Sequence, residues 1–251
     1  MKKHKQLLAL LLCLVMSISL ITGCGNKKEN AQEPKQSTEQ TENKEVAETR
    51  EITDMAGRKV TVPAAEKIES VFSSNPVSAI FLYMVAPDKL LGWNYELNDI
   101  EKSIILEKYH DLPNFGMGDA INYEAVIAAN PTIAVNCGKI NDAMVSDCDA
   151  LSESLGIPVV AVDNELENSA EAFRFMGELL GVEDHAEELA KYAERTFDDI
   201  ALLSDIPEDK KVRVYYGNGE DSLETAPNGS QHAQILDAIN AINVADLELG
   251  D

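Results

Sequence analysis

The sequence predicts an α/β fold of two Rossmann-like lobes with parallel sheets, joined by a single long helix, in which the second lobe is incomplete. Between residues 51 and 183, short apolar runs alternate with helical patterns, which is typical of a parallel sheet covered by helices. A long amphipathic pattern then occupies residues 184–205, and a new strand begins the segment 206–251. These three segments are the predicted N-terminal lobe, connecting helix and start of the C-terminal lobe.

Composition and charge narrow the class of protein. The chain has 251 residues, 45% of them hydrophobic and 26% charged, which is enough to bury a core. Its formal net charge of −23, with no local basic patch, excludes nucleic-acid binding. The four cysteines show no CxxC spacing, which argues against zinc fingers and thioredoxin-type redox sites.

The N-terminus is typical of a secreted lipoprotein. Three lysines precede an apolar run at Leu7–Ile21, which is shorter than the ~20 residues that a permanent membrane span prefers. The run leads into Thr22-Gly23-Cys24, which resembles the bacterial lipobox, in which the cysteine is lipidated. We predict a signal peptide at 1–23 and a lipid anchor on Cys24, holding the protein on the extracellular or periplasmic side of the cell membrane. A signal anchor with an incidental cysteine is the alternative.

Residues 24–50 are predicted to be a disordered tether. From Asn26 to Arg50 polar and charged residues dominate, no aromatic residue occurs, and Val46 is the only large aliphatic. Such a segment buries too little apolar surface to offset its conformational entropy. It carries no recognition role in our interpretation.

The first lobe is predicted to open with a β-hairpin. Its strands are 52–54 and 60–62, the turn contains Ala56-Gly57, and Pro63 ends the second strand. The alternation that follows predicts strands at 68–72, 89–93, 132–135 and 158–162, and helices at 76–85, 99–108, 123–129 and 142–155.

Two helices with clear terminal signals follow. We expect Asn168 to cap a helix that Gly181 ends, and Asp184 to cap the next one. The second helix has about six turns at 3.6 residues per turn. Its predicted apolar stripe consists of Leu189, Tyr192, Ala193, Thr196, Phe197, Ile200 and Leu203.

The segment after Pro207 has the pattern of a new α/β unit. We predict a strand at 212–216, a glycine-rich loop, a helix from Ser230 or Gln231 to Asn240, and a further strand at 243–244. A unit of this length has trouble burying enough surface to be stable alone.

These segments carry a resemblance to a known family. The stretches at 52–63, 68–72, 123–133, 214–219, 223–226 and 229–230 resemble ABC-transporter substrate-binding proteins for iron complexes and cobalamin. The resemblance implies two α/β lobes joined by one rigid helix, a ligand in the cleft between them, and an ABC permease with its ATPase as partners. Two departures are Asn240-Ala241, where the family has a Gly-Gly pair, and the end at Asp251, which indicates a fragment or a truncated gene.

Candidate ligand-binding residues follow the predicted strands, because loops and helix N-termini converge at the carboxyl ends of parallel strands. Hydroxyls and amides suit an oxygen-rich ligand, and aromatic rings suit the face of a chelate. The first-lobe candidates are Ser73, Ser74, Asn75, Trp93, Asn94, Tyr95, Asn136, Cys137 and Asp163, and the second-lobe candidates are Tyr216 and Asn218. The alternatives are helix capping at 73–75, core packing for the tryptophan and turn formation for the aspartate.

Glu124 is a candidate for docking on the permease. It stands at the start of a predicted surface helix and resembles the acidic residue with which the family contacts arginine pockets of the permease. The alternative is an ordinary acidic residue in a helix's first turn.

The residues point to binding rather than catalysis. No HExxH, Gly-x-Ser-x-Gly or Walker motif occurs, and we predict no cofactor and no metal-ligand set. Cys137 and Cys148 are expected to be free thiols, with pairing left open.

We therefore predict a monomeric, lipid-anchored receptor that delivers a metal complex or oxyanion to an ABC permease. The alternatives are a surface hydrolase or chelatase on a related scaffold, and an adhesive lipoprotein. Ferric siderophores, haem, corrinoids and oxyanions all remain open as ligands.

Overall fold

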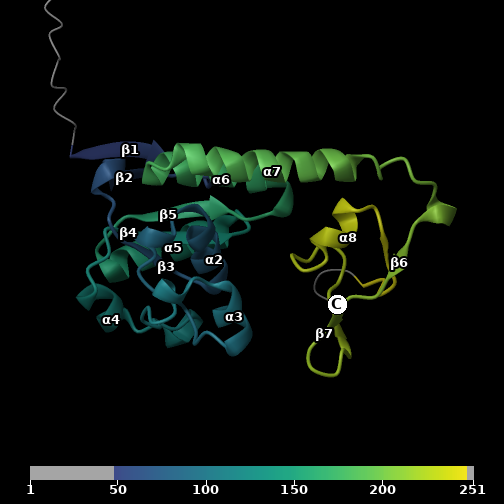
Figure 1. Cartoon of the computed structure of the whole chain (residues 1–251), viewed down its shortest axis with the longest axis horizontal. Coiled ribbons are helices and arrows are strands. Elements are labelled where there is room, and N and C mark those ends of the chain that lie inside the picture. The colour runs from purple at the N-terminus through teal and green to yellow at the C-terminus, as the bar shows by residue number, and fades with distance from the viewer. Residues whose placement is uncertain (1–47, 248–251) are drawn as a thin grey trace, which may run out of the picture. The chain divides into compact units, whose positions relative to one another are not determined.

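The computed structural model describes residues 48–247 (Figure 1). The predicted signal peptide, Cys24 and the tether up to residue 47 lie outside the described residues. None of the helices in residues 48–247 has the length and hydrophobicity that a membrane-spanning helix requires.

The predicted hairpin is confirmed. Strands β1 (Thr49–Thr53) and β2 (Lys59–Pro63) pair antiparallel, with Thr49 opposite Pro63. Strand β1 begins at Thr49, inside the segment 24–50 that was predicted to be a tether, because hydrogen bonds to the folded part hold Arg50 in place. Its guanidinium donates hydrogen bonds to the carbonyls of Glu178 and Leu179 at 2.8 and 2.9 Å, at the end of α6 (Ser169–Leu180).

The predicted parallel sheet is confirmed with three strands in the order β3 (Val71–Ser73), β4 (Ile133–Gly138) and β5 (Val159–Asp163). Its side chains alternate between two cores. One face contributes Val71, Ile133, Val135, Val160 and Val162, and the other contributes Phe72, Ala134, Val159 and Ala161.

The predicted strand at 89–93 is wrong. A 3₁₀ turn, η2 (Pro87–Lys89), occupies its start, and the rest makes only isolated bridges from Leu90 to Val71 and from Trp93 to Asn114. The physical reason lies at Gly92, where a Cβ atom would stand 2.3 Å from the carbonyl oxygen of Pro113. This close backbone approach replaces a continuous ladder.

Between residues 76 and 201 the chain forms six α-helices. They are α2 (Pro76–Val85), α3 (Asp99–Ile104), α4 (Tyr123–Ala128), α5 (Asp142–Leu155), α6 (Ser169–Leu180) and α7 (Glu183–Ala201). Further 3₁₀ turns are η1 (Ala65–Lys67), η3 (Glu107–Tyr109), η4 (Gly118–Ala120), η5 (Leu166–Asn168) and η6 (Glu208–Lys210). The bounds of α2 and α5 match the prediction, whereas α3 ends early because the chain turns to bury Ile105 and Tyr109.

The predicted N-terminal caps of α6 and α7 are wrong, whereas the predicted end of α6 at Gly181, with φ of 70°, is confirmed. Asn168 ends the turn η5, and its amide donates to Asp163 Oδ2 at 2.8 Å instead of accepting from α6. Helix α7 begins at Glu183 with Val182 before it and has no side-chain cap. Asparagines at positions 75, 98, 122 and 141 cap α2, α3, α4 and α5.

Helices α6 and α7 lie side by side through small residues (Figure 1). The buried residues of α7 are Ala186, Ala190 and Ala193. Tyr192 is 67% exposed and Thr196 is also exposed, so the predicted stripe is wrong at these two positions. A Cβ atom at Gly177 of α6 would lie 2.4 Å from Ala186 Cβ. The missing side chain therefore allows the close packing of the two helices.

The C-terminal segment contains short elements only. Strand β6 (Arg213–Val214) pairs in parallel with β9 (Ile242–Asn243), and β7 (Gly217–Asn218) pairs antiparallel with β8 (Glu224–Thr225). Helix α8 (Gln234–Ala238) is shorter than the predicted one. It ends before Asn240, which adopts a left-handed conformation with φ of 55° and donates to the carbonyls of Leu203 and Ser204 at 2.9 and 3.1 Å.

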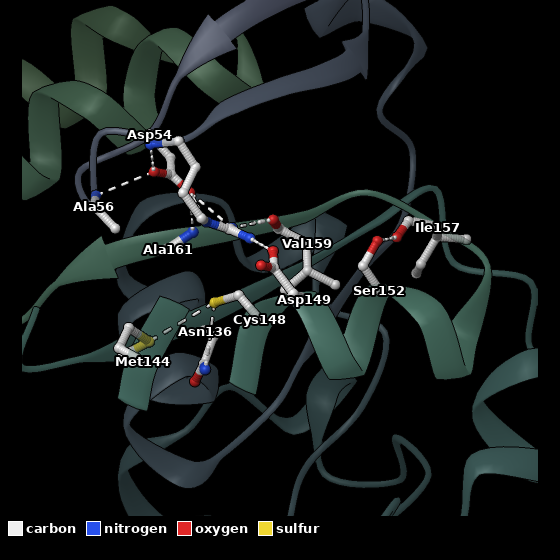
Figure 2. Close-up of polar contacts among 11 residues, drawn as sticks. Asp54, Ala56, Asn136, Met144, Cys148, Asp149, Ser152, Ile157, Val159 and Ala161 are labelled. Atoms are coloured by element: carbon white, nitrogen blue, oxygen red, sulfur yellow. Dashed lines mark hydrogen bonds and ion pairs between the residues drawn. The ribbon is translucent and has the colours of Figure 1, made fainter. Parts of the chain in front are cut away.

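A buried ion pair fastens the hairpin to the sheet (Figure 2). Asp54, in the turn between β1 and β2, has a fully buried carboxylate that accepts from Arg58 Nε and Nη2 at 3.0 and 2.8 Å and from the N–H of Ala161 in β5 at 3.1 Å. Arg58 also donates to the carbonyl of Val159 and to Asp149 of α5, both at 2.7 Å. Although burial lowers the pKa of Arg58, its hydrogen bonds to the two aspartates leave this pKa raised overall.

Candidate functional site

The carboxyl edge of the sheet brings five of the predicted residues together. Asn75 Nδ2 donates to Asn136 Oδ1 at 3.0 Å and to the carbonyl of Cys137 at 3.1 Å, and Ser74 Oγ donates to Asn136 Oδ1 at 2.7 Å. The fifth residue, Ser73, precedes Ser74 at the end of β3. The polar groups of this network satisfy one another, so it fixes the N-terminus of α2 over the sheet.

Two of these residues do not follow a strand as predicted. Asn136 and Cys137 lie inside β4, which runs on to Gly138 because the ladder with β5 continues to Asp163. Cys137 donates its backbone N–H to Ser78 Oγ at 2.8 Å, which joins β4 to α2.

Trp93 and Asn94, which were predicted to contact the ligand, are core residues in this structure. Each is 1% exposed. The indole N–H of Trp93 donates to the carbonyl of Tyr109 at 2.8 Å, and Asn94 Nδ2 donates to the carbonyl of Ser73 at 2.9 Å. The hydroxyl of Ser73 donates to Asn94 Oδ1 at 3.2 Å, so Ser73 also has no polar group free for a ligand.

Tyr95 and Asp163 are half-buried and engaged locally. The Tyr95 hydroxyl donates to Glu101 Oε1 at 2.9 Å, and burial together with this neighbour raises the pKa of the tyrosine. Asp163 accepts from the N–H of Glu165 at 2.9 Å and from Asn168 Nδ2. The aspartate is thus a turn former, the alternative that the sequence left open.

One hollow contains a predicted second-lobe residue, Tyr216. It has a volume of about 390 Å³ and is lined by Val77, Asn164, Leu166, Tyr216, Gln231, His232, Gln234 and Ile235. These residues come from α2, from the loop that follows β5, and from the C-terminal segment around α8. Asn218, the other predicted residue of that lobe, is exposed in β7 and does not line the hollow.

Two hydrogen bonds connect the walls of this hollow. Gln231 Nε2 donates to Asn164 Oδ1 at 2.7 Å, and Gln234 Oε1 accepts from the N–H of Leu166 at 3.1 Å. The rings of Tyr216 and His232 are stacked, with centroids 6.3 Å apart and planes inclined by 27°. Gln231, Gln234 and His232 were not among the site residues predicted from the sequence, although they closely follow the Gly229-Ser230 turn.

A second hollow, of about 370 Å³, adjoins the first through Leu166 and Gln234. Its walls hold Glu165, Leu166, Glu167, Phe197, Gln234, Asp237 and Ala238. Glu165 is paired with Lys139 at 2.9 Å. In residues 48–247 no three histidine, cysteine or acidic side chains converge as a metal site.

The thiols of Cys137 and Cys148 are free and buried. Burial raises the pKa of Cys137 to about 12. Cys148 lies between Asn136 Nδ2, at 3.6 Å from its sulfur, and Met144 Sδ, at 3.8 Å (Figure 2). The expected free thiols are confirmed in this structure.

Glu124 is exposed near the start of α4, whose N-terminus is capped by Asn122 through a bond from the N–H of Ala125 at 3.0 Å. Tyr123 and Ile127 on the same helix are also exposed. The carboxylate is therefore accessible to a partner.

Comparison with known proteins shows which family has this architecture. Residues 83–248 match the family model of the periplasmic binding protein. No curated protein matches the chain. The matched family and the similar solved structures are solute-binding proteins rather than enzymes.

Three solved structures illustrate the likeness. An ABC transporter solute binding protein from Sulfurospirillum deleyianum is 24% identical, with a TM-score of 0.66 over 75% of this chain and 60% of that one. The molybdate periplasmic binding protein MolA of Haemophilus influenzae is 20% identical, with a TM-score of 0.59 over 78% of this chain and 66% of that one. The heme-binding protein RhuT from Roseiflexus is 18% identical, with a TM-score of 0.53 over 71% of this chain and 66% of that one.

The chain spans 60–66% of the length of these three proteins, and at these identities the likeness concerns the fold. The family model, in contrast, covers more than half of the chain, from the last residues of α2 through α3 to α7 and the C-terminal segment. The chain therefore belongs to the periplasmic binding protein family, whose members have two α/β lobes.

Proposed function

We propose that this protein is the solute-binding component of an ABC importer, which captures a metal complex outside the cytoplasm and hands it to a permease. The observation that carries the proposal is the hollow at Asn164, Tyr216 and Gln231, where the loop after β5 meets the C-terminal segment. Ligands of open α/β sheets bind at the carboxyl ends of the strands, and this loop follows such an end. The family membership of the chain supports the same function.

The mechanism is capture and delivery without bond breaking. The network around Asn75 and Asn136 holds the N-terminus of α2 beside the sheet, so that one wall of the hollow is fixed before ligand arrives. Preorganisation of this kind lowers the entropic cost of binding. The other wall, around α8, contributes Tyr216, His232 and the two glutamines.

We also propose that Glu124 docks on the permease. Its carboxylate is exposed at the start of α4, where it can form a charge-assisted pair with an arginine of the partner. A Glu124→Gln variant should bind solute normally and reduce solute uptake in cells by about tenfold. Glu153→Gln, an exposed change on α5, is the matched control and should leave uptake unchanged. Equal uptake in both variants would remove the docking role.

Lipid anchoring of Cys24 is part of the proposal and rests on the lipobox-like sequence. Mass spectrometry of the membrane-bound protein should find an acylated cysteine as its first residue. A Cys24→Ser variant should be lost from the membrane fraction, and its retention there would contradict the anchor.

Capture itself is tested by native mass spectrometry of the full chain purified from its own cells. We expect one equivalent of a small molecule that contains a metal, on a monomeric protein. Gln231→Leu should lower the occupancy, whereas Glu153→Gln should not. If no small molecule accompanies the protein, and none binds from a panel of ferric siderophores, haem, cobalamin and molybdate, the proposed function fails.

A further inference from the structure

The lining of the hollow described above contains no acidic side chain, although the formal net charge of the whole chain is −23. Its eight residues comprise three amide side chains, three aliphatic side chains and one stacked pair of rings. Within residues 48–247, the lining contains no carboxylate, ammonium or guanidinium group. The walls therefore offer hydrogen bonds and apolar contact without a full charge.

The amides retain hydrogen-bonding capacity. Gln231 Nε2 and Asn164 Oδ1 bond each other, and Gln234 Oε1 accepts from Leu166. Each amide has a second polar atom that makes no hydrogen bond within residues 48–247. These atoms are Asn164 Nδ2, Gln231 Oε1 and Gln234 Nε2. An amide pair of this type presents donors and an acceptor together, which suits ligand amide, hydroxamate or hydroxyl groups.

The rest of the lining provides apolar contact. Val77 on α2 and Ile235 on α8 are 47% and 45% exposed. The rings of Tyr216 and His232 form a flat surface beside them. A ligand with an organic shell would cover these side chains on binding, and the burial of apolar surface favours the complex.

The charged groups near the hollow are acidic, because the adjoining hollow contains Glu165, Glu167 and Asp237. Asp163 accepts hydrogen bonds from the N–H of Glu165 and from Asn168, and Glu165 is paired with Lys139 at 2.9 Å. A small dianion in the hollow would lose its hydration without gaining a counter-charge, which is costly. An uncharged complex has no such cost.

We infer that the hollow recognises an electrically neutral metal chelate whose organic shell carries amide, hydroxamate or hydroxyl groups, in preference to a free oxyanion or a polycarboxylate complex. This inference rests on the proposed function and narrows its substrate class. Asn164, Gln231 and Gln234 provide the hydrogen bonds, and Tyr216 with His232 provides the flat contact surface.

Calorimetry on the full chain with three probes tests the inference. The probes are ferrichrome, which is a neutral ferric trihydroxamate, ferric dicitrate and molybdate. We expect ferrichrome to bind at least tenfold more tightly than either anion, with less than a twofold change in Kd between 50 and 500 mM NaCl, because no ion pair is formed. Tighter binding of either anion, or a steep salt dependence, would overturn the inference.

Variants locate the binding. Gln231→Leu and His232→Ala should each weaken ferrichrome binding by about tenfold. His185→Ala, an exposed histidine on α7 outside the hollow, is the control and should not change Kd. Unchanged binding in both hollow variants would also overturn the inference.

The results of these experiments distinguish a failure of the neutral-chelate inference from a failure of the proposed solute-binding function. If an anionic probe binds and ferrichrome does not, the protein is a solute receptor and the neutral-chelate inference is wrong. If none of the three probes binds, haem and cobalamin do not bind either, and no small molecule accompanies the protein from its own cells, the proposed function itself is wrong.

Discussion

Replacement of Asp54 by asparagine should strongly destabilise the fold. The carboxylate is fully buried and accepts five hydrogen bonds (Figure 2). Its Oδ1 accepts from the backbone N–H groups of Ala56 and Arg58, and its Oδ2 accepts from Arg58 Nε, Arg58 Nη2 and the N–H of Ala161. An asparagine at this position can still accept the two hydrogen bonds at Oδ1. Its NH₂ group would replace Oδ2 and, being a donor itself, could not accept from Arg58 Nε, Arg58 Nη2 or the N–H of Ala161.

The magnitude follows from the burial of the pair. Removal of one partner of a buried ion pair costs about 3–5 kcal/mol, because the remaining charge is left without compensation. Arg58 keeps its bonds to Asp149 and to the carbonyl of Val159, so we expect about 3 kcal/mol for Asp54→Asn. This is a large share of the ~5–15 kcal/mol that stabilises a typical domain.

Urea unfolding followed by circular dichroism measures the effect. The matched control is Glu51→Gln, which breaks the exposed pair with Lys59 at 2.9 Å on the same hairpin and should cost about 0–1 kcal/mol. Because the hairpin docks on β5 through Asp54, proteolysis of Asp54→Asn should also begin in the hairpin. A loss no larger than that of Glu51→Gln would refute the reasoning.

Three further outcomes follow from the described contacts. Gly177→Leu should lower stability by about 1–3 kcal/mol in urea unfolding, because its side chain would meet Ala186, and an unchanged midpoint would contradict this close packing. Hydrogen bonds from Arg174 lower the pKa of Glu187, so this pair stabilises the fold above the ordinary pKa of glutamate and loses its effect as the pH falls through the lowered value. Melting temperature should therefore fall less steeply with acid in Arg174→Met than in the parent, and equal slopes would count against the pair. The thiol of Cys137 should react with a disulfide reagent only on unfolding, and rapid reaction in the native protein would show that it is not buried.

Local signals predicted much of the fold correctly. The hairpin follows from two alternating runs around Ala56-Gly57, and the bounds of Pro76–Val85 and Asp142–Leu155 follow from apolar periodicity that ends near a glycine or alanine. The parallel sheet follows from the alternation of strands and helices. Each of these features depends on residues that are close together in the sequence.

Features that depend on tertiary contacts were less predictable. The run at 89–93 has the composition of a strand, but close packing of Gly92 against the backbone of Pro113 leaves only isolated bridges. Trp93 has the polar edge of a ligand platform, but its indole N–H is bonded in the core.

The hollow was also hard to predict from the sequence, because its lining comes from segments that are far apart in the chain. Its walls meet through Asn164 and Gln231, which are 67 positions apart. Nothing local in the sequence pairs these two amides, so their contact appears only in the folded chain. Tyr216 was predicted because it directly follows an apolar run, whereas Gln231 and His232 carry no comparable local pattern.

The contact of Arg50 with the end of α6 has a mechanical consequence. A protein that is held at a surface by its N-terminus receives any pull at the first residues of β1. An antiparallel hairpin pulled from its open end separates one hydrogen bond at a time, which offers little resistance. Arg50, bonded to the carbonyls of Glu178 and Leu179, passes that load to a helix of the main body before the hairpin ladder has to carry it.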